Sequence, residues 1–136
     1  MTGASSPKLT GSAAVLLVKD VVAAAKHYRD AMGFEYGRFY GDPPGFVILW
    51  RDDMYLMLKH VAETSLIRPL LSAGVESCDV YFWTSDVKAL HAELVQRGAT
   101  IDDSLYLQPY GCLEFAFRDL DGYQIRFGQV VAEDRA

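Results

Sequence analysis

Cysteine and histidine are scarce in this sequence, with two and three of them in 136 residues. Cys78 and Cys112 fall near the starts of two different predicted strands, so a disulfide framework is not indicated. His27 and His91 lie on predicted helices, and only His60, at the end of a predicted strand, is placed to take part in a site. The sequence contains neither the spacing of a Ser/His/Asp or Cys/His nucleophile nor a glycine-rich phosphate loop, so it predicts no catalytic residue.

Positive charge and long apolar runs are also in short supply. The 13 Lys and Arg residues are outnumbered by 18 Asp and Glu, which gives a net charge of -5. Such a chain offers no basic stripe for phosphates, so nucleic acid is not the expected partner, and a cationic or neutral small molecule is more compatible. No run approaches the roughly 18 apolar residues that span a membrane, and residues 1–10 lack the apolar core of a secretion signal. We therefore expect a cytoplasmic protein with no membrane partner.

The residues that are present form one repeated pattern. A composition of 51% hydrophobic and 23% charged residues fits a single globular domain over residues 1–136. A strand at 12–18 precedes a helix capped by Asp20 and ended by Gly33, and Asp86 and Gly98 bracket a second helix after a strand at 77–85. Three strands follow each helix, and their predicted ranges are 35–40, 46–51 and 54–59 in the first copy, then 99–107, 112–118 and 123–127 in the second.

This repeat predicts an α+β fold built from two pseudosymmetric βαβββ modules. The first module covers about 12–59, a linker covers 60–76, and the second module covers about 77–129. Each helix covers the outer face of a mixed four-stranded sheet, and the two inner faces enclose a cleft.

Side-chain alternation predicts which residues line this cleft. On the last hairpin, Phe115, Phe117, Ile125 and Phe127 face the core, which places Glu114 and Arg126 on the cleft side. These two can form a cross-strand ion pair, which would leave Asp79 as the free charge of the cleft, or they can contact a ligand. In the first module, Trp50 and Ile48 are predicted to face the core, and Val47 and Leu49 the cleft, together with Leu17 and Leu58.

The strand at 77–85 carries the most distinctive candidates. Asp79, Tyr81 and Trp83 alternate with Val80 and Phe82, and the first three are predicted to face the cleft. Two aromatic rings and a carboxylate suit a planar or cationic ligand, through stacking and cation-π attraction. The alternative is that Tyr81 and Trp83 only fill space between the modules.

The segments DVVAAAKHYRDAMGF (20–34) and RDLDGYQIRFGQ (118–129) make this chain resemble the vicinal oxygen chelate superfamily, over about residues 12–129. That superfamily contains glyoxalases, extradiol dioxygenases, fosfomycin resistance enzymes and bleomycin resistance proteins. The resemblance places its metal ligands at Ala13, at Leu58 or Met57, at Asp79 and at Arg126. Only one of these residues is a good ligand, so the resemblance implies the bleomycin-resistance-like branch, which binds ligands without a metal.

We therefore expect a metal-independent small-molecule binding protein without a cofactor, and an antibiotic is one candidate ligand. The predicted ligand-binding residues are Leu17, Leu58, Asp79, Tyr81, Trp83, Tyr110, Glu114 and Arg126. The rival is a lyase, isomerase or dioxygenase with an atypical metal set such as Asp79, Glu114 and His60. A third possibility is an interaction module that uses the cleft as a dimer surface. The resemblance also implies a homodimer, with Pro7 as a hinge for an exchanged N-terminal arm.

Overall fold

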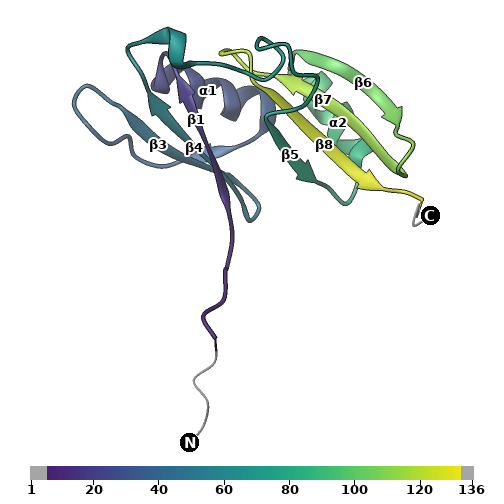
Figure 1. The fold of residues 1–136 in the computed structure, drawn as a ribbon. Helices are drawn as coiled ribbons and strands as arrows, with labels where there is room; N and C mark the ends of the chain where they lie inside the picture. The colour runs from purple at the N-terminus through teal and green to yellow at the C-terminus, as the bar shows by residue number, and fades with distance from the viewer. Residues whose placement is uncertain (1–5, 133–136) are drawn as a thin grey trace, which may run out of the picture.

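The computed structural model describes residues 6–132, which form two four-stranded sheets and two α-helices (Figure 1). The elements of the first half are β1 Ala13–Val18, α1 Val21–Met32, β2 Glu35–Tyr36, β3 Phe46–Arg51 and β4 Met54–His60. The second half contains β5 Val80–Trp83, α2 Val87–Gln96, β6 Ile101–Leu107, β7 Cys112–Arg118 and β8 Gln124–Val130. A short 3-10 helix, η1 Thr64–Leu66, lies in the linker between them. Neither α-helix is both long and apolar enough to cross a membrane, within residues 6–132.

The two sheets have the same topology, as the sequence repeat predicts. Sheet one has the order β1-β4-β3-β2 and sheet two the order β5-β8-β7-β6. In each, the first and last strands of the module pair in parallel and the other neighbours are antiparallel. The predicted α+β class with two mixed four-stranded sheets is therefore confirmed. The strand expected at 35–40 keeps only Glu35 and Tyr36, with a single bridge from Tyr40 to Phe46, because the glycines at 37 and 41 weaken strand pairing.

Both helices begin at the predicted residues and α1 ends at the predicted Gly33, whereas α2 ends at Gln96 with Arg97 as its C-cap, just before Gly98. The Asp20 carboxylate accepts hydrogen bonds from the backbone N–H groups of Val22 and Ala23, at 3.1 and 3.0 Å. Asp86 caps α2 in the same way through Ala89, at 3.0 Å. Gly33 ends α1 in the left-handed region with φ 68°, which a side chain would disfavour. These local signals mark the helix starts, and at α2 the side chain of Gln129 on β8 also accepts a hydrogen bond from the first N–H, that of Val87, at 2.9 Å.

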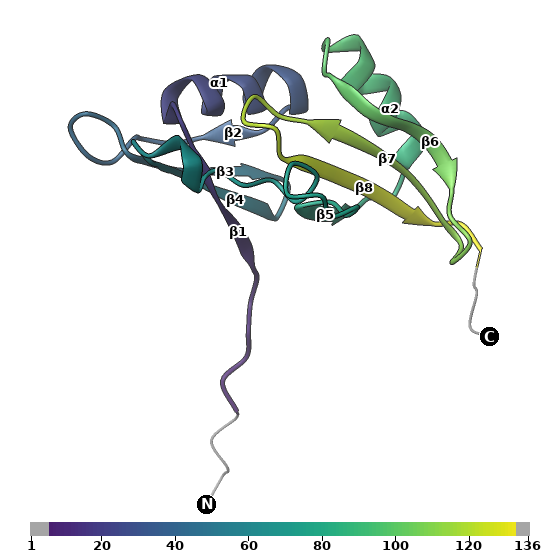
Figure 2. The same ribbon diagram turned by 45° about the horizontal axis from the view of Figure 1, so that its top comes forward.

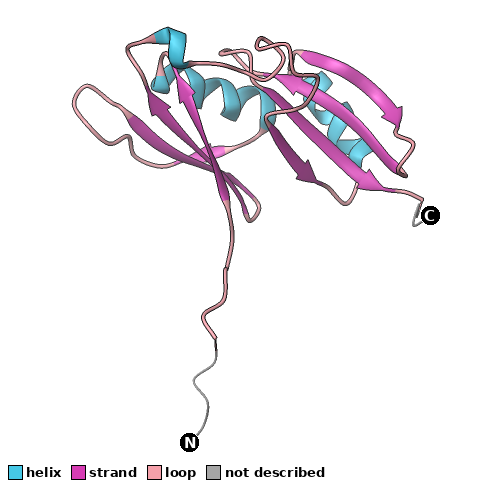
Figure 3. Cartoon of the chain, in the orientation of Figure 1, coloured by secondary structure: helices cyan, strands magenta, loops and turns pink. Residues whose placement is uncertain are grey.

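The helices lie on the same side of the two sheets, and the sheets lie side by side (Figures 1 and 2). We call the sheet faces turned away from the helices the open faces. The helix-side faces form one continuous core, which includes Tyr28 of α1, Phe115 and Phe117 of β7, and Ile125 of β8. Figure 3 shows that loops alone connect the two halves apart from η1.

The structure corrects the predicted facing of β3 and β4. Val47 and Leu49 are fully buried in the core, whereas Ile48 and Trp50 lie on the open face. Leu58 is also 0% exposed and pairs with Val47, so its predicted place in the cleft is wrong. The reason is that both faces of these strands are apolar, so alternation alone cannot tell which face α1 covers.

The two modules are joined by polar contacts as well as by the core. The Tyr28 hydroxyl donates a hydrogen bond to the buried carboxylate of Asp119. The Tyr123 hydroxyl donates to the backbone carbonyl of Leu17 at 2.7 Å. Elsewhere between the two modules, Arg51 of β3 donates two hydrogen bonds to Glu93 of α2, at 2.8 and 2.9 Å. These contacts hold the two sheets in a fixed relation.

Candidate functional site

A cavity of about 520 Å³ lies on the open face of sheet two. Its lining comes from the linker and from β5 to β8, and none of it comes from sheet one. The lining residues are Leu71, Glu76, Ser77, Cys78, Tyr81, Asp102, Asp103, Gln108, Tyr110, Glu114, Gln124 and Arg126. Four of the predicted ligand-binding residues, Tyr81, Tyr110, Glu114 and Arg126, therefore meet in one place.

Glu114 of β7 is the most buried of these four residues. It is 1% exposed, and its Oε2 atom accepts hydrogen bonds from the Tyr81 hydroxyl at 2.6 Å and from the Tyr110 hydroxyl at 2.7 Å. Hydrogen bonds to a carboxylate are stronger than neutral ones, so both phenols are held in place. Burial, and then the bond to Glu114, raises the pKa of Tyr110 to about 12 and raises the pKa of Tyr81 further. Both tyrosines therefore keep their protons and act as hydrogen-bond donors.

The second carboxylate oxygen of Glu114 has a different environment. Oε1 has no hydrogen-bond partner within residues 6–132, and the nearest opposite charge is Nη1 of Arg126, at 3.5 Å. Arg126 donates through Nη2 to Asp103 at 2.6 Å and to Gln124 at 3.0 Å. The predicted pairing of Glu114 with Arg126 is thus present as a diagonal contact, since Arg126 lies opposite Ala116 in the sheet.

Gly128 of β8 explains how Tyr81 reaches Glu114. Tyr81 is on β5, and β8 lies between β5 and β7. The Tyr81 ring crosses the sheet above Gly128, where a Cβ atom would lie 1.8 Å from the Tyr81 hydroxyl. A residue without a side chain is therefore required at 128 for the Tyr81–Glu114 hydrogen bond to form.

Asp79 is not the free charge that the sequence predicts. Its Oδ1 accepts a hydrogen bond from the backbone N–H of Leu70 at 3.0 Å, and its Oδ2 accepts one from Gln124 at 2.9 Å. The carboxylate thus ties the linker to the start of β8. This correction follows from the linker, whose path over the end of sheet two cannot be read from the sequence.

Trp83 and Leu17 lie outside the cavity lining. Trp83 is 61% exposed, and its ring lies 4.7 Å from that of Tyr81, so it forms the rim next to the cavity. It also lines a smaller cavity of about 80 Å³ with Phe34 and Phe82. Leu17 lies on the open face of sheet one, where its side chain is half-buried. Leu58 is in the core, as described above.

Sequence reasoning missed the contributions of β6 and the linker. Asp103 of β6 lies opposite Ala116, on the open face, but β6 shifts register on both sides of Asp103. Such irregularities hide the alternation that would have identified Asp103 as a site residue. Cys78 and Glu76 reach the cavity from the linker end, and no sequence signal marks them.

The cavity is acidic. Four carboxylates line it, those of Glu76, Asp102, Asp103 and Glu114, against the single guanidinium of Arg126. Asp102 is compensated, because Arg118 donates to it at 2.8 Å and Gln124 at 2.7 Å. Although burial opposes the effect, these hydrogen bonds lower the pKa of Asp102. The remaining charge favours a cationic group near the cavity mouth.

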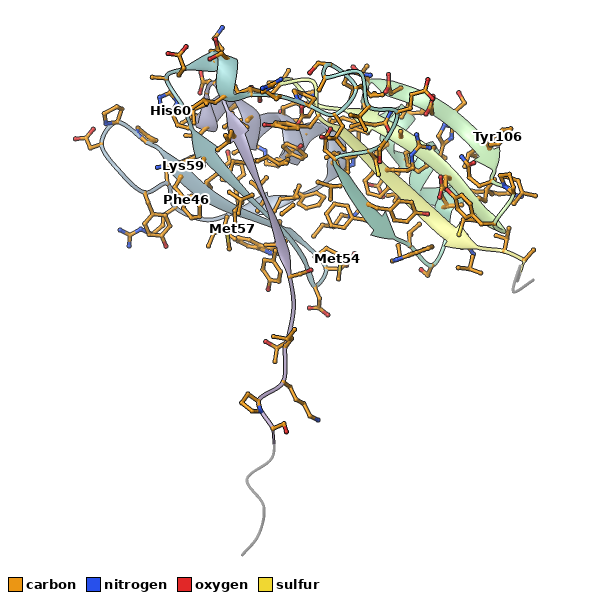
Figure 4. All side chains as sticks on the ribbon, in the orientation of Figure 1. Phe46, Met54, Met57, Lys59, His60 and Tyr106 are labelled. Carbon is orange, nitrogen blue, oxygen red and sulfur yellow. The ribbon has the colours of Figure 1, made fainter. Side chains whose placement is uncertain are left out.

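The residues do not fit a bound metal ion. Residues 6–132 contain no group of three or more His, Cys, Asp or Glu side chains placed to hold one. Of the positions that the resemblance assigns to ligands, Ala13 has no donor atom, Asp79 is committed to two backbone N–H groups, and Arg126 is a cation. The alternative set does not assemble either, because His60, whose Nδ1 lies 2.9 Å from the Lys19 carbonyl, is on sheet one (Figure 4).

Comparison with known proteins agrees with this fold. The Glyoxalase/Bleomycin resistance protein/Dioxygenase superfamily model matches residues 12–127. TioX from Micromonospora sp. ML1 is similar at 21% identity and a TM-score of 0.70, covering 90% of this chain and 99% of TioX. TnmS3, an antibiotic binding protein from Streptomyces sp. CB03234, is similar at 23% identity and a TM-score of 0.69, covering 93% and 99% of the two chains.

A third structure is the bleomycin-binding protein from bleomycin-producing Streptomyces verticillus, in complex with copper(II)-bleomycin. Its TM-score is 0.65 at 22% identity, covering 94% of this chain and all (100%) of that one. No curated protein sequence is similar enough to count as a relative. At such low identities, the three structures support the fold and leave the ligand to be argued from the cavity.

Proposed function

We propose a function for this chain, which belongs to the Glyoxalase/Bleomycin resistance protein/Dioxygenase superfamily. It is a small-molecule binding protein that works without a metal ion. Its binding site is the cavity on sheet two. The ligand is a planar aromatic compound or an organic cation, and an antibiotic is one possible ligand class.

The observation that carries this proposal is the cluster of Tyr81, Tyr110, Glu114 and Arg126 in one cavity. A volume of about 520 Å³ is large enough for a drug-sized molecule. The exposed ring of Trp83 beside Tyr81 offers a flat surface on which an aromatic ligand can stack. Glu76 and Asp103 at the mouth supply charge complementarity for a cation.

Binding without a metal fits the donor atoms that are present. Of the two carboxylates in the rival metal set, Asp79 accepts from two backbone N–H groups and Glu114 accepts through Oε2 from two tyrosine hydroxyls. Sequestration of a ligand needs no catalytic group, and the names of TnmS3 and the bleomycin-binding protein support an antibiotic as the class of ligand to test first.

The proposal includes a homodimer. The open face of sheet one is largely apolar, with Val15 56% and Tyr55 42% exposed, which is costly in a monomer. Residues 6–12 extend from the edge strand β1 away from both sheets (Figures 1 and 2). A second copy of the chain would cover the apolar face, and the arm that contains Pro7 would be exchanged between the copies.

The test is a fluorescence titration in which Trp83 is the only tryptophan. In the Trp50→Phe background, planar cations and neutral aromatic compounds are titrated into the protein. Binding in the cavity should quench Trp83. Replacing the exposed Glu76 by Gln should weaken the binding of the cations and leave the binding of the neutral compounds unchanged, and this difference should shrink at high salt. Cation binding that quenches Trp83 but is insensitive to Glu76→Gln and to salt would place the cation elsewhere.

A further inference from the structure

We infer that the floor of the cavity recognises a neutral amide edge, meaning a carbonyl acceptor next to an N–H donor, as in a lactam or a primary carboxamide. The inference rests on the proposed function, because it names the ligand group that this same cavity accepts. Its basis is one pair of atoms, Oε1 of Glu114 and Nη1 of Arg126, which lie 3.5 Å apart.

Oε1 of Glu114 is an unused acceptor. The other oxygen of the carboxylate receives two tyrosine hydroxyls, but Oε1 receives no hydrogen bond within residues 6–132 although Glu114 is 1% exposed. Buried polar atoms in native proteins nearly always have a partner, and an exception at a cavity wall points to a missing ligand group. An N–H group of the ligand would supply that partner.

Among the described residues, 6–132, Nη1 of Arg126 makes no hydrogen bond and is a donor beside this acceptor. The hydrogen bonds of the guanidinium group to Asp103 and Gln124 both leave from Nη2. Nη1 faces Glu114 at 3.5 Å, which is too long for a hydrogen bond. A ligand carbonyl would accept from Nη1 while the adjacent ligand N–H donates to Oε1.

Charge selects against other groups at this position. A cation that approaches Oε1 also approaches the Arg126 guanidinium and is repelled, and an anion that approaches Nη1 is repelled by Glu114. A neutral group that both accepts and donates satisfies the two atoms at once. A cationic part of the same ligand would instead lie at the mouth, near Glu76 and Asp103.

Entry of the amide edge requires Arg126 to turn, because Oε1 exposes no surface of its own. This turn breaks the contacts of the Arg126 guanidinium with Asp103 and Gln124, and water can replace it at Asp103, which is 56% exposed. The tyrosine pair has the opposite role. Tyr81 and Tyr110 fix the carboxylate so that Oε1, and not Oε2, is left for the ligand.

The experiment uses three probes that share one ring system: isocarbostyril, which has the amide edge, N-methylisocarbostyril, which lacks the N–H, and the N-methylisoquinolinium cation. Dissociation constants are measured on the full chain by NMR chemical-shift titration, which also locates each probe. We expect isocarbostyril to bind about tenfold more tightly than its N-methyl analogue, the size of one buried hydrogen bond to a charged group.

Glu114→Gln is the key variant. Gln has one oxygen, which the two tyrosine hydroxyls require, so its NH₂ group would occupy the place of Oε1 and turn an acceptor into a donor. In this variant the two compounds should have about equal dissociation constants, or the N-methyl analogue should bind more tightly. Arg126→Lys removes Nη1 and provides a test even if Glu114→Gln does not fold. It should reduce the binding of isocarbostyril and of its N-methyl analogue. Glu63→Gln is the matched control, since Glu63 is exposed in the linker, away from the cavity, and its carboxylate accepts a hydrogen bond from Ser65 at 3.2 Å.

The outcomes separate this inference from the proposed function. Equal binding of the two lactams in the cavity of the native chain overturns the amide edge and leaves the binding function standing. A preference that persists in Glu114→Gln also overturns it. If none of the three probes shifts the resonances of the cavity residues, both the inference and the proposed binding site are wrong.

Discussion

Sheet one and sheet two have the same strand order and the same pairing, but their open faces carry opposite chemistry. Val15 of β1 pairs with Met57 of β4, whereas the equivalent pair in sheet two is Tyr81 of β5 with Arg126 of β8. In Figure 4, Met57 lies among the strands of sheet one and Tyr106 lies on β6 of sheet two. One face is suited to packing and the other to hydrogen bonding. The repeat therefore sets the backbone positions, and the side chains at those positions make only the open face of sheet two polar.

The largest expected difference between the sheets is at Gly128 and its equivalent in sheet one, Lys59. Gly128→Ala places a methyl group 1.8 Å from the Tyr81 hydroxyl, so the Tyr81 ring must move away from Glu114. Overpacking costs roughly 1–3 kcal/mol, and the lost hydrogen bond adds to it. Lys59→Ala, at an exposed position, should cost under about 0.5 kcal/mol. Urea unfolding measures both, and equal losses would show that the Tyr81 network does not depend on Gly128.

The next effect concerns the tyrosines. Tyr81→Phe removes one of two hydrogen bonds from the buried carboxylate of Glu114, and a bond to a charged group is worth about 1.5–3 kcal/mol. Tyr55→Phe, on the open face of sheet one, removes an exposed hydroxyl and should change the free energy of unfolding by less than about 0.5 kcal/mol. Thermal unfolding of both variants provides the test. A loss in Tyr55→Phe as large as that in Tyr81→Phe would mean that the two faces contribute alike.

The free energy of unfolding should depend on pH through Asp119, which lies where the two modules contact each other. Burial raises the pKa of Asp119 to about 6, in spite of its hydrogen bonds with Tyr28 and Tyr123. The folded state therefore binds a proton more tightly than the unfolded state, whose Asp pKa is about 3.9. The stabilising contribution of the protonated group is fully present below about pH 4 and is lost as the pH rises through about 6.

The size of this pH effect is at most about 3 kcal/mol, because the pKa rises by about two units and one unit corresponds to about 1.4 kcal/mol. His27 acts in the opposite direction, since burial lowers its pKa and favours the neutral ring at higher pH. The measurement is therefore the difference between the native chain and Asp119→Asn, by urea unfolding from pH 4 to about 7. Parallel stability curves for the two proteins would contradict the assignment.

The smallest expected effect is that of added metal ions. A ligand at a hundred times its dissociation constant raises the free energy of unfolding by about 2.7 kcal/mol. Zinc, nickel, manganese and iron(II) should produce no such rise, because neither sheet has a full ligand set. Differential scanning calorimetry with each metal checks this. A saturable increase in Tm with any one of them would favour the rival enzyme function.

The structural features that depend on local sequence patterns were predicted correctly. The caps Asp20, Gly33 and Asp86, and the order of elements in both modules, follow from residue types at fixed spacing. The facing of β7 and β8 was also correct, because Glu114 and Arg126 contrast with the phenylalanines on the other face. In β3 and β4 both faces are apolar, so the same reasoning failed for Val47, Leu49 and Leu58.

The two-module fold and its one polar face follow from the residue pattern alone, because hydrophobic alternation and helix caps act over a few residues. Which residues form the site depends on the folded chain. Asp79 accepts hydrogen bonds from both the linker and β8, and Asp103 lies on β6, whose register is irregular. Gly128 leaves room for Tyr81 to reach Glu114. Each of these depends on atoms brought together from distant parts of the chain, by a linker path and a strand register that no local pattern encodes.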